Sequence, residues 1–504
     1  MTDLKTSHGL QVREEKMKEK RKQTPFREYL KEIASWSPLV FHKNNGMISK
    51  YPPVQRLGKV IPNKEHQELR DNFSKSWLDY DFSISFFENL QKLFSTVPFS
   101  HMRNENSENC EFADVVINSK NAYLSSTVIS GSENVLYCFS VKDNSKNIFN
   151  SVMVWDNSEN VYFCTGIFNS FNIFYSKFLI NCSNIRFSTN LMWCHDCILC
   201  NDLENKSYCI KNQEYSKEEY QLKKQELLKD KNHFSVYYDN LSKRGNNFGS
   251  TNVEGDLIFK SENIKNGNLC YNVKDGRNLI LVWSRDGAEH IYDCFTWWSP
   301  YGLDFYGVMG AWAAENIYNV TYVDFGATNI YYSCDIISCS YCIWCVGLKN
   351  KQFCILNKEY SKEERFELAN KIFTQMGKDW ILGQFFPWWM NPFYFNDTAA
   401  CLIDDSFTKE EVAKAGYLRR DGEIKVDIPQ WADVVETQNL ASYEWFDEQW
   451  NRQINPDILK KVIKDEKWNY YRIVKMEYDF LMKHALPLPE LHRLERIKLG
   501  FKFK

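Results

Sequence analysis

Apolar and polar positions follow a short repeated pattern between residues 106 and 191. A phrase of the form Asn-Ser-x-Asn, or a close variant, recurs every 12 or 13 residues, and its copies begin at Asn106, Asn118, Gly131, Asn144, Asn157, Asn169 and Asn181. The copies can be aligned on the last Asn of the phrase. The residues one and seven positions after this Asn are then apolar and largely β-branched, and the residue four positions after it is small. Such columns are typical of short parallel strands stacked in a solenoid, where each unit buries the apolar face of the next.

The three columns predict the core of this solenoid. They hold Cys110, Ala122, Val135, Ile148, Val161, Ile173 and Ile185 at the first position, Ala113, Ser125, Cys138, Ser151, Cys164, Ser176 and Ser188 at the second, and Val116, Val128, Val141, Val154, Ile167, Leu179 and Leu191 at the third. Asn and Ser suit the corners between strands, because Asn tolerates left-handed backbone and both bind nearby backbone groups. The repeat is either half of a coil of about 25 residues or a whole two-sided rung.

A second set of phrases follows, at Lys260, Asp275, Asp286, Ala313 and Gly326. Residues 203–219 match residues 348–364 at a constant offset of 145, and each copy leads into a helix start capped by Ser216 or Ser361. The chain is therefore expected to be mainly β: a parallel β-helix or β-solenoid in two tandem arrays, with α-helical caps, a linker helix and a C-terminal α region.

The expected regions are 1–100, a helical N-terminal cap; 101–213, the first array; 214–250, the linker helix; 251–358, the second array; and 359–504, a helical and aromatic C-terminal region. Residues 10–35 and 83–94 are expected to be helical, and the second of these could cap the first rung. The tail from residue 455 onwards also has a helical pattern.

Composition narrows the functional classes. Lys and Arg number 62 against 65 Asp and Glu, so the chain lacks the basic bias that general binding to a phosphate backbone needs. No stretch reaches the roughly 18 apolar residues of a spanning helix, which predicts no membrane partner. All sixteen cysteines lie between Cys110 and Cys401, and no signal peptide precedes them, which favours a cytoplasmic protein with thiols that are free or bind metal.

Two cysteine tetrads are the sharpest chemical feature. They share the 145-residue offset and consist of Cys194, Cys197, Cys200 and Cys209, and of Cys339, Cys342, Cys345 and Cys354. Four thiolates at this spacing could hold zinc or an iron–sulfur cluster. The alternative is a set of structural thiols, with Cys194 and Cys197 replacing Asn in the two Asn columns of the next repeat. No other cofactor is indicated, and disulfides are the minority interpretation.

Aromatic and acidic residues suggest two further sites. Tyr123, Phe149, Tyr162 and Phe174 form a ring ladder that, if exposed, could stack on sugars or single-stranded bases, and otherwise stacks on itself along the rungs. The regular phrase breaks down where carboxylates gather near rings, as in a polysaccharide-cleaving groove. These residues are Asp286, His290, Asp293, Trp297, Trp298, Asp304, Tyr306 and Trp312. No His lies in a motif with a Ser or Cys nucleophile, so the sequence shows no hydrolase signature.

The tandem phrases, the duplicated closing segment and the runs at 385–399 and 408–417 resemble an uncharacterised Asn- and Cys-rich tandem-repeat family of candidate-phylum bacteria. The resemblance covers roughly residues 75–504. Members of that family often carry zinc-ribbon modules at both ends, which would imply binding to zinc and to nucleic acid or protein. Residues 1–100 and 402–504 contain no cysteine here, so those ribbon sites are absent.

These observations favour a non-enzymatic binding or assembly scaffold built on a repeat β-solenoid, with an unknown protein or nucleic-acid partner. One alternative is a polysaccharide-binding or polysaccharide-cleaving β-helix protein. Another is a zinc-binding structural protein that uses the two tetrads. The sequence indicates neither the number of chains in the assembly nor a catalytic residue.

Overall fold

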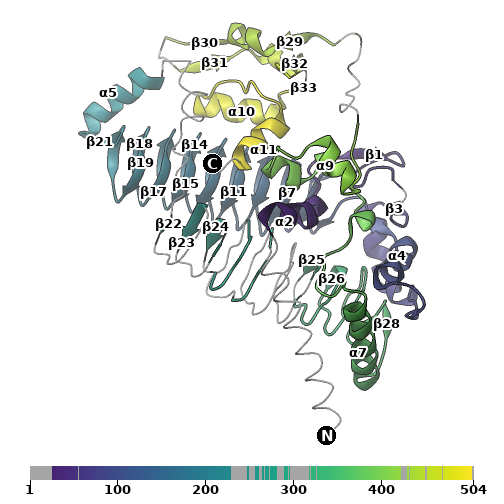
Figure 1. The fold of residues 1–504 in the computed structure, drawn as a ribbon. Helices are drawn as coiled ribbons and strands as arrows, with labels where there is room; N and C mark the ends of the chain where they lie inside the picture. The colour runs from purple at the N-terminus through teal and green to yellow at the C-terminus, as the bar shows by residue number, and fades with distance from the viewer. Residues whose placement is uncertain are drawn as a thin grey trace. The chain divides into compact units, whose positions relative to one another are not determined.

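A computed structural model describes residues 25–54, 56–228, 247–248, 256–259, 264–265, 267–271, 273–280, 289–292, 294–295, 317, 319–324, 326–421, 428, 430, 432–448, 451–467 and 469–501 (Figure 1). The chain divides into two compact units, each made of separate stretches of sequence. One unit comprises 103–243 and 421–503, and the other comprises 1–102, 244–420 and 504. The region expected at 359–504 is therefore divided near residue 420 between the two units.

A β-solenoid of about nine turns forms most of the first unit, which confirms the fold expected for this part of the chain. Its strands are β5 (Asn104–Glu105), β6 (Phe112–Ile117), β7 (Lys120–Ile129), β8 (Glu133–Leu136), β9 (Phe139–Val141), β10 (Lys146–Phe149), β11 (Val152–Trp155), β12 (Glu159–Tyr162), β13 (Thr165–Phe168), β14 (Phe171–Phe174), β15 (Lys177–Ile180), β16 (Ser183–Arg186), β17 (Thr189–Met192), β18 (His195–Ile198), β19 (Asn201–Glu204) and β20 (Ser207–Ile210).

Each sequence repeat is one complete turn of the coil. The strand β12 pairs in parallel with β10 and with β14, so that Val161 lies beside Ile148 and Ile173. Left-handed backbone recurs at every third residue, as at Asn160, Phe163, Gly166 and Asn169. The chain thus bends four times per turn, and a unit of 12 or 13 residues is long enough to close.

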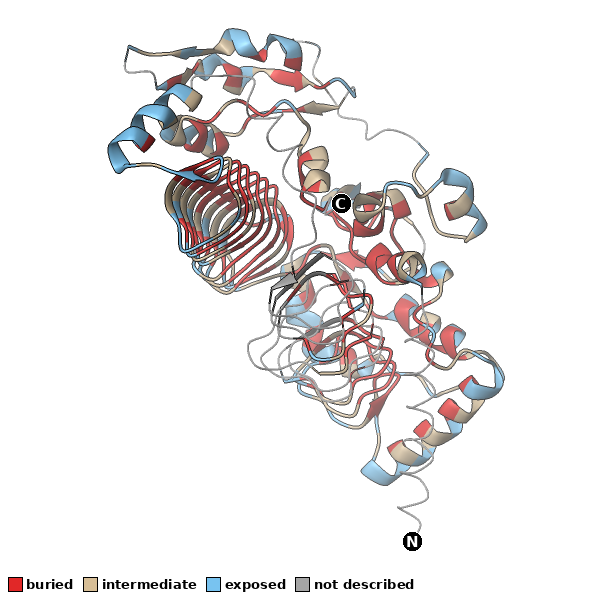
Figure 2. Cartoon of the chain, turned by 60° about the vertical axis from the view of Figure 1, so that its left-hand side comes forward, coloured by how far each residue is buried: buried red, intermediate tan, exposed pale blue. Residues whose placement is uncertain are grey.

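Every third residue also points into the core, and Figure 2 shows buried residues recurring in each turn of this coil. Ser158, Val161, Cys164 and Ile167 form one such set, and none is more than 1% exposed. The three columns predicted as core are confirmed, and the Ser of the Asn-Ser-x-Asn phrase is a fourth. The expectation that this Ser lies at a corner is wrong, because the first and last residues of the phrase take the left-handed backbone and the Ser between them does not.

Hydroxyls and thiols in the core hold successive turns together. The backbone N–H of Cys164 donates to Ser151 Oγ at 3.0 Å, and that of Ser176 donates to Cys164 Sγ at 3.4 Å. The Ser151 hydroxyl donates in turn to the carbonyl of Phe149 at 2.7 Å. An alanine could not accept the inward-pointing N–H of the next turn, which explains why every position of this column after Ala113 is Ser or Cys.

The rest of this unit is a mixed α and β region, so the helical expectation for the tail holds only in part. It contains β21 (Gln213–Glu214), α5 (Lys217–Leu228), β29 (Val434–Glu436), η5 (Thr437–Tyr443), β30 (Glu444–Phe446), β31 (Arg452–Ile454), η6 (Pro456–Lys460), β32 (Val462–Lys464), β33 (Tyr470–Tyr471), α10 (Lys475–His484) and α11 (Arg493–Phe501). The order β29-β32-β33 forms a small sheet, and β30 pairs with β31.

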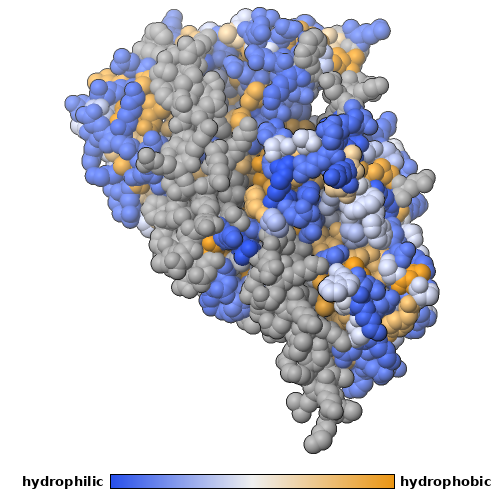
Figure 3. Space-filling model, viewed as in Figure 1, coloured by the Kyte–Doolittle hydropathy of each residue, from blue (hydrophilic) through white to orange (hydrophobic). Residues whose placement is uncertain are grey.

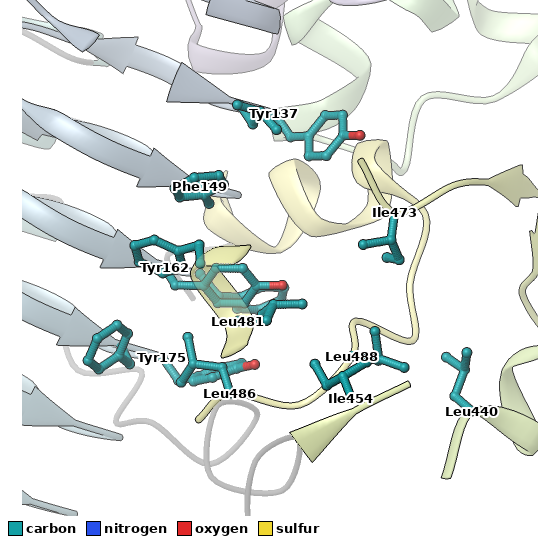
Figure 4. Packing of buried hydrophobic residues seen from close by; sticks show 14 of the residues in the cluster. Tyr137, Phe149, Tyr162, Tyr175, Leu440, Ile454, Ile473, Leu481, Leu486 and Leu488 are labelled. Atoms are coloured by element: carbon teal, nitrogen blue, oxygen red, sulfur yellow. The ribbon is translucent and has the colours of Figure 1, made fainter. Parts of the chain in front are cut away.

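Helices α10 and α11 pack directly on the solenoid. Figure 4 shows Leu481 and neighbouring C-terminal residues facing rings such as Tyr162 of the stacked strands. A buried ion pair joins Arg496 Nη1 to Glu477 Oε1 at 2.8 Å, and Arg496 also donates to Asn150 Oδ1 at 2.7 Å. At Gly500 a Cβ atom would lie 2.5 Å from Val152, so the close approach of α11 requires glycine.

The second unit has elements from both ends of its sequence range. Its N-terminal elements are α2 (Phe26–Glu32), η1 (Ala34–Trp36), β1 (His42–Asn44), β2 (Met47–Ser49), β3 (Val60–Ile61), α3 (Asn63–Leu69), η2 (Arg70–Lys75), α4 (Phe86–Thr96) and β4 (Phe99–Ser100). Its later elements are β22 (Asn247–Phe248), β23 (Asp256–Phe259), β24 (Gly267–Tyr271), β25 (Thr321–Asp324), β26 (Cys334–Ile337), β27 (Cys354–Ile355), β28 (Lys358–Glu359), α7 (Lys362–Lys378), η3 (Trp388–Met390), η4 (Phe395–Asp397), α8 (Ala399–Ile403) and α9 (Lys409–Lys414).

The helix starts expected at Ser216 and Ser361 are confirmed. Ser85 and Ser361 form capping boxes at α4 and α7, Ser216 bonds to Glu219 at α5, and Thr408 caps α9. The helix α4 packs on Tyr332 and Trp344 within its own unit, with ring centroids 4.9 and 4.2 Å from Phe86. The expected helical residues 10–24 and residues 229–246 of the expected linker helix lie outside the described residues. The linker expectation is wrong at residues 247–248, which form strand β22.

The two closing segments have the same structure in both copies. In each, a short antiparallel hairpin ends the coil, with Cys209 beside Glu214 in one and Cys354 beside Glu359 in the other. The ion pair of Lys206 with Glu214, at 3.1 Å, recurs as that of Lys351 with Glu359, at 3.2 Å. The 145-residue sequence match is therefore also a structural match.

Candidate functional site

One side of the first solenoid presents a continuous ladder of side-chain amides. Each Asn Nδ2 donates to the Oδ1 of the residue one turn further on, at 2.9 to 3.3 Å. The members of this Asn ladder are Asn109, Asn121, Asn134, Asn147, Asn160, Asn172 and Asn184, and the last of them donates to Asp196. Because each amide donates to the next turn, the ladder holds this side rigid.

A stripe of alternating charges runs beside the Asn ladder. In each turn it contains the residue directly before the Asn of the ladder. These residues are Glu108, Lys120, Glu133, Lys146 and Glu159, and they are called the charged stripe below. Lys120 Nζ lies 3.0 Å and Lys146 Nζ 3.7 Å from carboxylate oxygens of Glu133, and both lysine side chains are about half exposed. No prediction above includes this stripe, although alignment of the repeats places its five residues in one column.

Beyond the charged stripe, large rings lie exposed. Phe171 continues the column of the stripe and is 42% exposed, and Trp193 lies two turns further on and is 45% exposed. Neighbouring parallel strands lie about 4.8 Å apart, so successive turns of the solenoid present their outward side chains at that interval. On the face drawn in Figure 3 the described surface is mostly hydrophilic, with apolar residues in small patches.

The predicted stacking ladder is not a free surface in this structure. Phe149, Tyr162 and Phe174 are at most 3% exposed, and Tyr123 is partly buried beside the same cluster. Phe480 of α10 lies with its ring centroid 4.4 Å from that of Phe149 and 6.0 Å from that of Tyr162. A ligand could stack on these three rings only if α10 moved away, so this site stays a prediction.

The first cysteine tetrad occupies the core of the last turns. The expectation that Cys194 and Cys197 replace corner Asn residues is wrong: Asp196 continues the Asn ladder, and Cys197 pairs with Ile185 in the apolar column. All eight tetrad cysteines are buried. Each thiol lies 3.3 to 3.5 Å from the carbonyl two residues earlier, which gives the neutral S–H a partner.

The sulfur atoms nevertheless influence one another. A hydrogen bond with Cys197 lowers the pKa of Cys194 to about 7, and the same contact raises the pKa of Cys197. In the second tetrad, contact with Cys342 likewise lowers the pKa of Cys339 and raises that of Cys342. Across the described part of the chain, no group of three or more His, Cys, Asp or Glu side chains is arranged to hold a metal ion. Zinc binding stays a prediction.

The acidic cluster cannot be assembled from the described residues. Asp286, Asp293, Trp297, Trp298, Asp304, Tyr306 and Trp312 lie outside them. His290 is described and forms an ion pair with Asp275 through Nδ1. The groove predicted around Asp293 and Asp304 therefore stays a prediction.

Comparison with known proteins yields no match: no family model, no curated protein and no solved structure resembles the chain. The resemblance to an Asn- and Cys-rich repeat family stays a prediction. None of the helices in the described ranges is both long and apolar enough to cross a bilayer.

Proposed function

We propose that this protein is a binding scaffold whose first solenoid presents the Asn ladder and the charged stripe to a protein partner. The observation that supports this function is a rigid polar side that repeats at every turn. The neighbouring ring ladder is covered by the chain's own helices, whereas Lys120 and Lys146 stay half exposed.

The charges favour a protein over a nucleic acid. The stripe contains three Glu and two Lys, so a phosphate backbone laid along it would meet a carboxylate at every second turn. An extended polypeptide can place charges of both signs at intervals that match the turns.

The test is chemical cross-linking in host lysate followed by mass spectrometry of the bound material. In K120E/K146E the stripe becomes wholly acidic, and the matched control K460E/K475E changes two other exposed lysines of the same unit. We expect one protein to bind the wild type and the control and to be lost from K120E/K146E. Equal capture by all three, or capture of nucleic acid instead, would contradict the proposal.

Carbohydrate binding is the second candidate, and the exposure of Phe171 and Trp193 favours it. Rings on a rigid surface stack on sugar faces, and these two lie on a side that the ring ladder does not share. Binding of W193A and wild type to a glycan array tests this function: it predicts a glycan that only the wild type binds.

We further propose that residues 251–358 form a second array, in a cytoplasmic protein. Supporting observations are the parallel pairs β23–β24 and β25–β26 and the parallel bridges from Thr328–Ser340 to Ile343–Ile355. These bridges join residues 12 apart. The free thiols support the reducing compartment.

A further inference from the structure

The last two turns of the first solenoid bring together a serine, a histidine and an aspartate. His195 and Ser207 are neighbours in one outward-facing column, because β18 and β20 pair with these residues side by side. Ser207 Oγ lies 2.7 Å from His195 Nε2. On the other side of the ring, His195 Nδ1 lies 3.7 Å from Asp196 Oδ2.

The aspartate is held by the Asn ladder. Its other oxygen, Oδ1, accepts a hydrogen bond from Asn184 Nδ2 at 3.3 Å, and Asp196 takes a left-handed backbone conformation that continues the corner column. The edge of the Tyr208 ring also packs on His195, with centroids 5.9 Å apart. The imidazole is thus placed between a hydroxyl and a fixed carboxylate, which is the order of groups in a nucleophile, base and orienting acid.

We propose that Ser207 is the nucleophile of an ester-hydrolysing site, with His195 as its base and Asp196 as a positioning residue. His195 Nε2 takes the hydroxyl proton while Ser207 Oγ attacks the ester carbonyl carbon. The C–O bond to the alcohol then breaks, and the imidazolium returns the proton to that alcohol. Water, deprotonated by the same nitrogen, attacks the acyl-serine carbonyl carbon. The bond from that carbon to Ser207 Oγ breaks, the imidazolium returns the proton to Ser207 Oγ, and the carboxylic acid leaves, so that no oxidant or further reactant is required.

The site is open to a substrate. The His195 side chain is 50% exposed, and Trp193 projects from the same turn with 45% of its surface exposed. Phe171 lies two turns earlier in the column of His195. These rings offer apolar contact to the acyl or alcohol part of an ester that approaches the solenoid surface.

The second copy shows that the fold does not require these three residues. At the 145-residue offset, Ser340, Tyr341 and Gln352 replace His195, Asp196 and Ser207, yet Ser340 and Gln352 still pair and the same hairpin closes the coil. Stability of the closing turns therefore does not explain why a serine, a histidine and an aspartate meet in the first copy.

The experiment measures labelling by a fluorophosphonate probe and hydrolysis of p-nitrophenyl acetate. We expect the probe to modify Ser207, as located by peptide mass spectrometry, and hydrolysis to fall by about 100-fold or more in S207A and in H195Q. Ser183 occupies the same column one turn earlier, so S183A is the matched control and should keep both activities.

The variant H195S/S207Q copies two positions of the second closing segment and leaves Asp196 in the Asn ladder, so it should fold with an unchanged melting temperature while losing both activities. The proposal is overturned if folded wild-type protein is neither labelled nor active. It is equally overturned if S207A retains the wild-type rate or if S183A loses it. The assignment does not depend on the scaffold function.

Discussion

At the scale of single residues, left-handed backbone is the main constraint on this sequence. It recurs at every third residue of the solenoid, and most positions in the Asn ladder take φ near 55°. Asn occupies these positions at little conformational cost and also bonds to the next turn. Aromatic residues such as Phe163 and Tyr175 take the same conformation elsewhere, where burial under the C-terminal helices offsets the strain.

The Asn ladder gives a first prediction, at Asn147. Its side chain accepts from Asn134 at 2.9 Å and donates to Asn160 at 3.1 Å. We expect N147A to lower the free energy of unfolding by about 2–3 kcal/mol, since two hydrogen bonds and the left-handed preference are lost. N147G should lose less, because glycine keeps the conformation. Urea unfolding of both variants checks this, and equal losses would contradict it.

Two buried histidines give a prediction of pH dependence. Burial lowers the pKa of His484 to about 4 and that of His492 to about 3, both near cationic Arg or Lys side chains. Between pH 6.5 and 4 the unfolded chain therefore binds protons that the folded chain does not, so the free energy of unfolding should fall as the pH falls. Urea unfolding at several pH values should show that the free energy of unfolding depends less steeply on pH in H484Q/H492Q than in the wild type. An unchanged slope would exclude these two groups as its cause.

At the scale of elements, the ring ladder and α10 form one packed layer. Phe480 contacts three rings of the ladder and is 6% exposed. The ring ladder therefore forms the surface on which α10 packs, although α10 lies some 300 residues later in the sequence.

We expect F480A to destabilise this layer by about 3–5 kcal/mol, because it removes a large buried ring. The control is L222A on α5, whose side chain is 70% exposed and should change the free energy of unfolding by less than about 0.5 kcal/mol. Urea unfolding measures both. Similar small effects would show that α10 does not depend on the ladder.

At the scale of the whole molecule, the duplication is visible in an exchanged pair of residues. In the first copy Arg186 lies on a rung and Tyr220 on the following helix, and each influences the pKa of the other. At the 145-residue offset the two types are exchanged: Tyr331 lies on a rung and Arg365 on the helix, with 5.9 Å between the guanidinium and the ring. The two positions thus influence each other in both copies, although the two residue types have exchanged places.

This exchange predicts coupling between the two positions. R186Y should destabilise the first unit, and R186Y/Y220R, which copies the second arrangement, should recover part of the loss. A double-mutant cycle by urea unfolding should give a coupling energy of about 1–3 kcal/mol. Additive effects of R186Y and Y220R would show that the two side chains do not act as a pair.

The sequence by itself determined the solenoid, its core columns and its closing helices. These features depend on local repetition: a residue type that recurs every 12 or 13 residues meets its own copies in the next turn, so periodicity alone predicts the contact. The same reasoning could have paired residue 195 with residue 207, because the repeat places both in one column.

Tertiary structure decided which of the repeated surfaces are free. The coil closes in one repeat because left-handed residues bend it four times, a conformation that sequence does not reveal at Phe163 or Tyr175. Segments with no repeat relation to the solenoid bury the ring ladder through Phe480, and they bind the solenoid through the hydrogen bond from Arg496 to Asn150. Such contacts join residues more than 300 positions apart, and no local pattern records them.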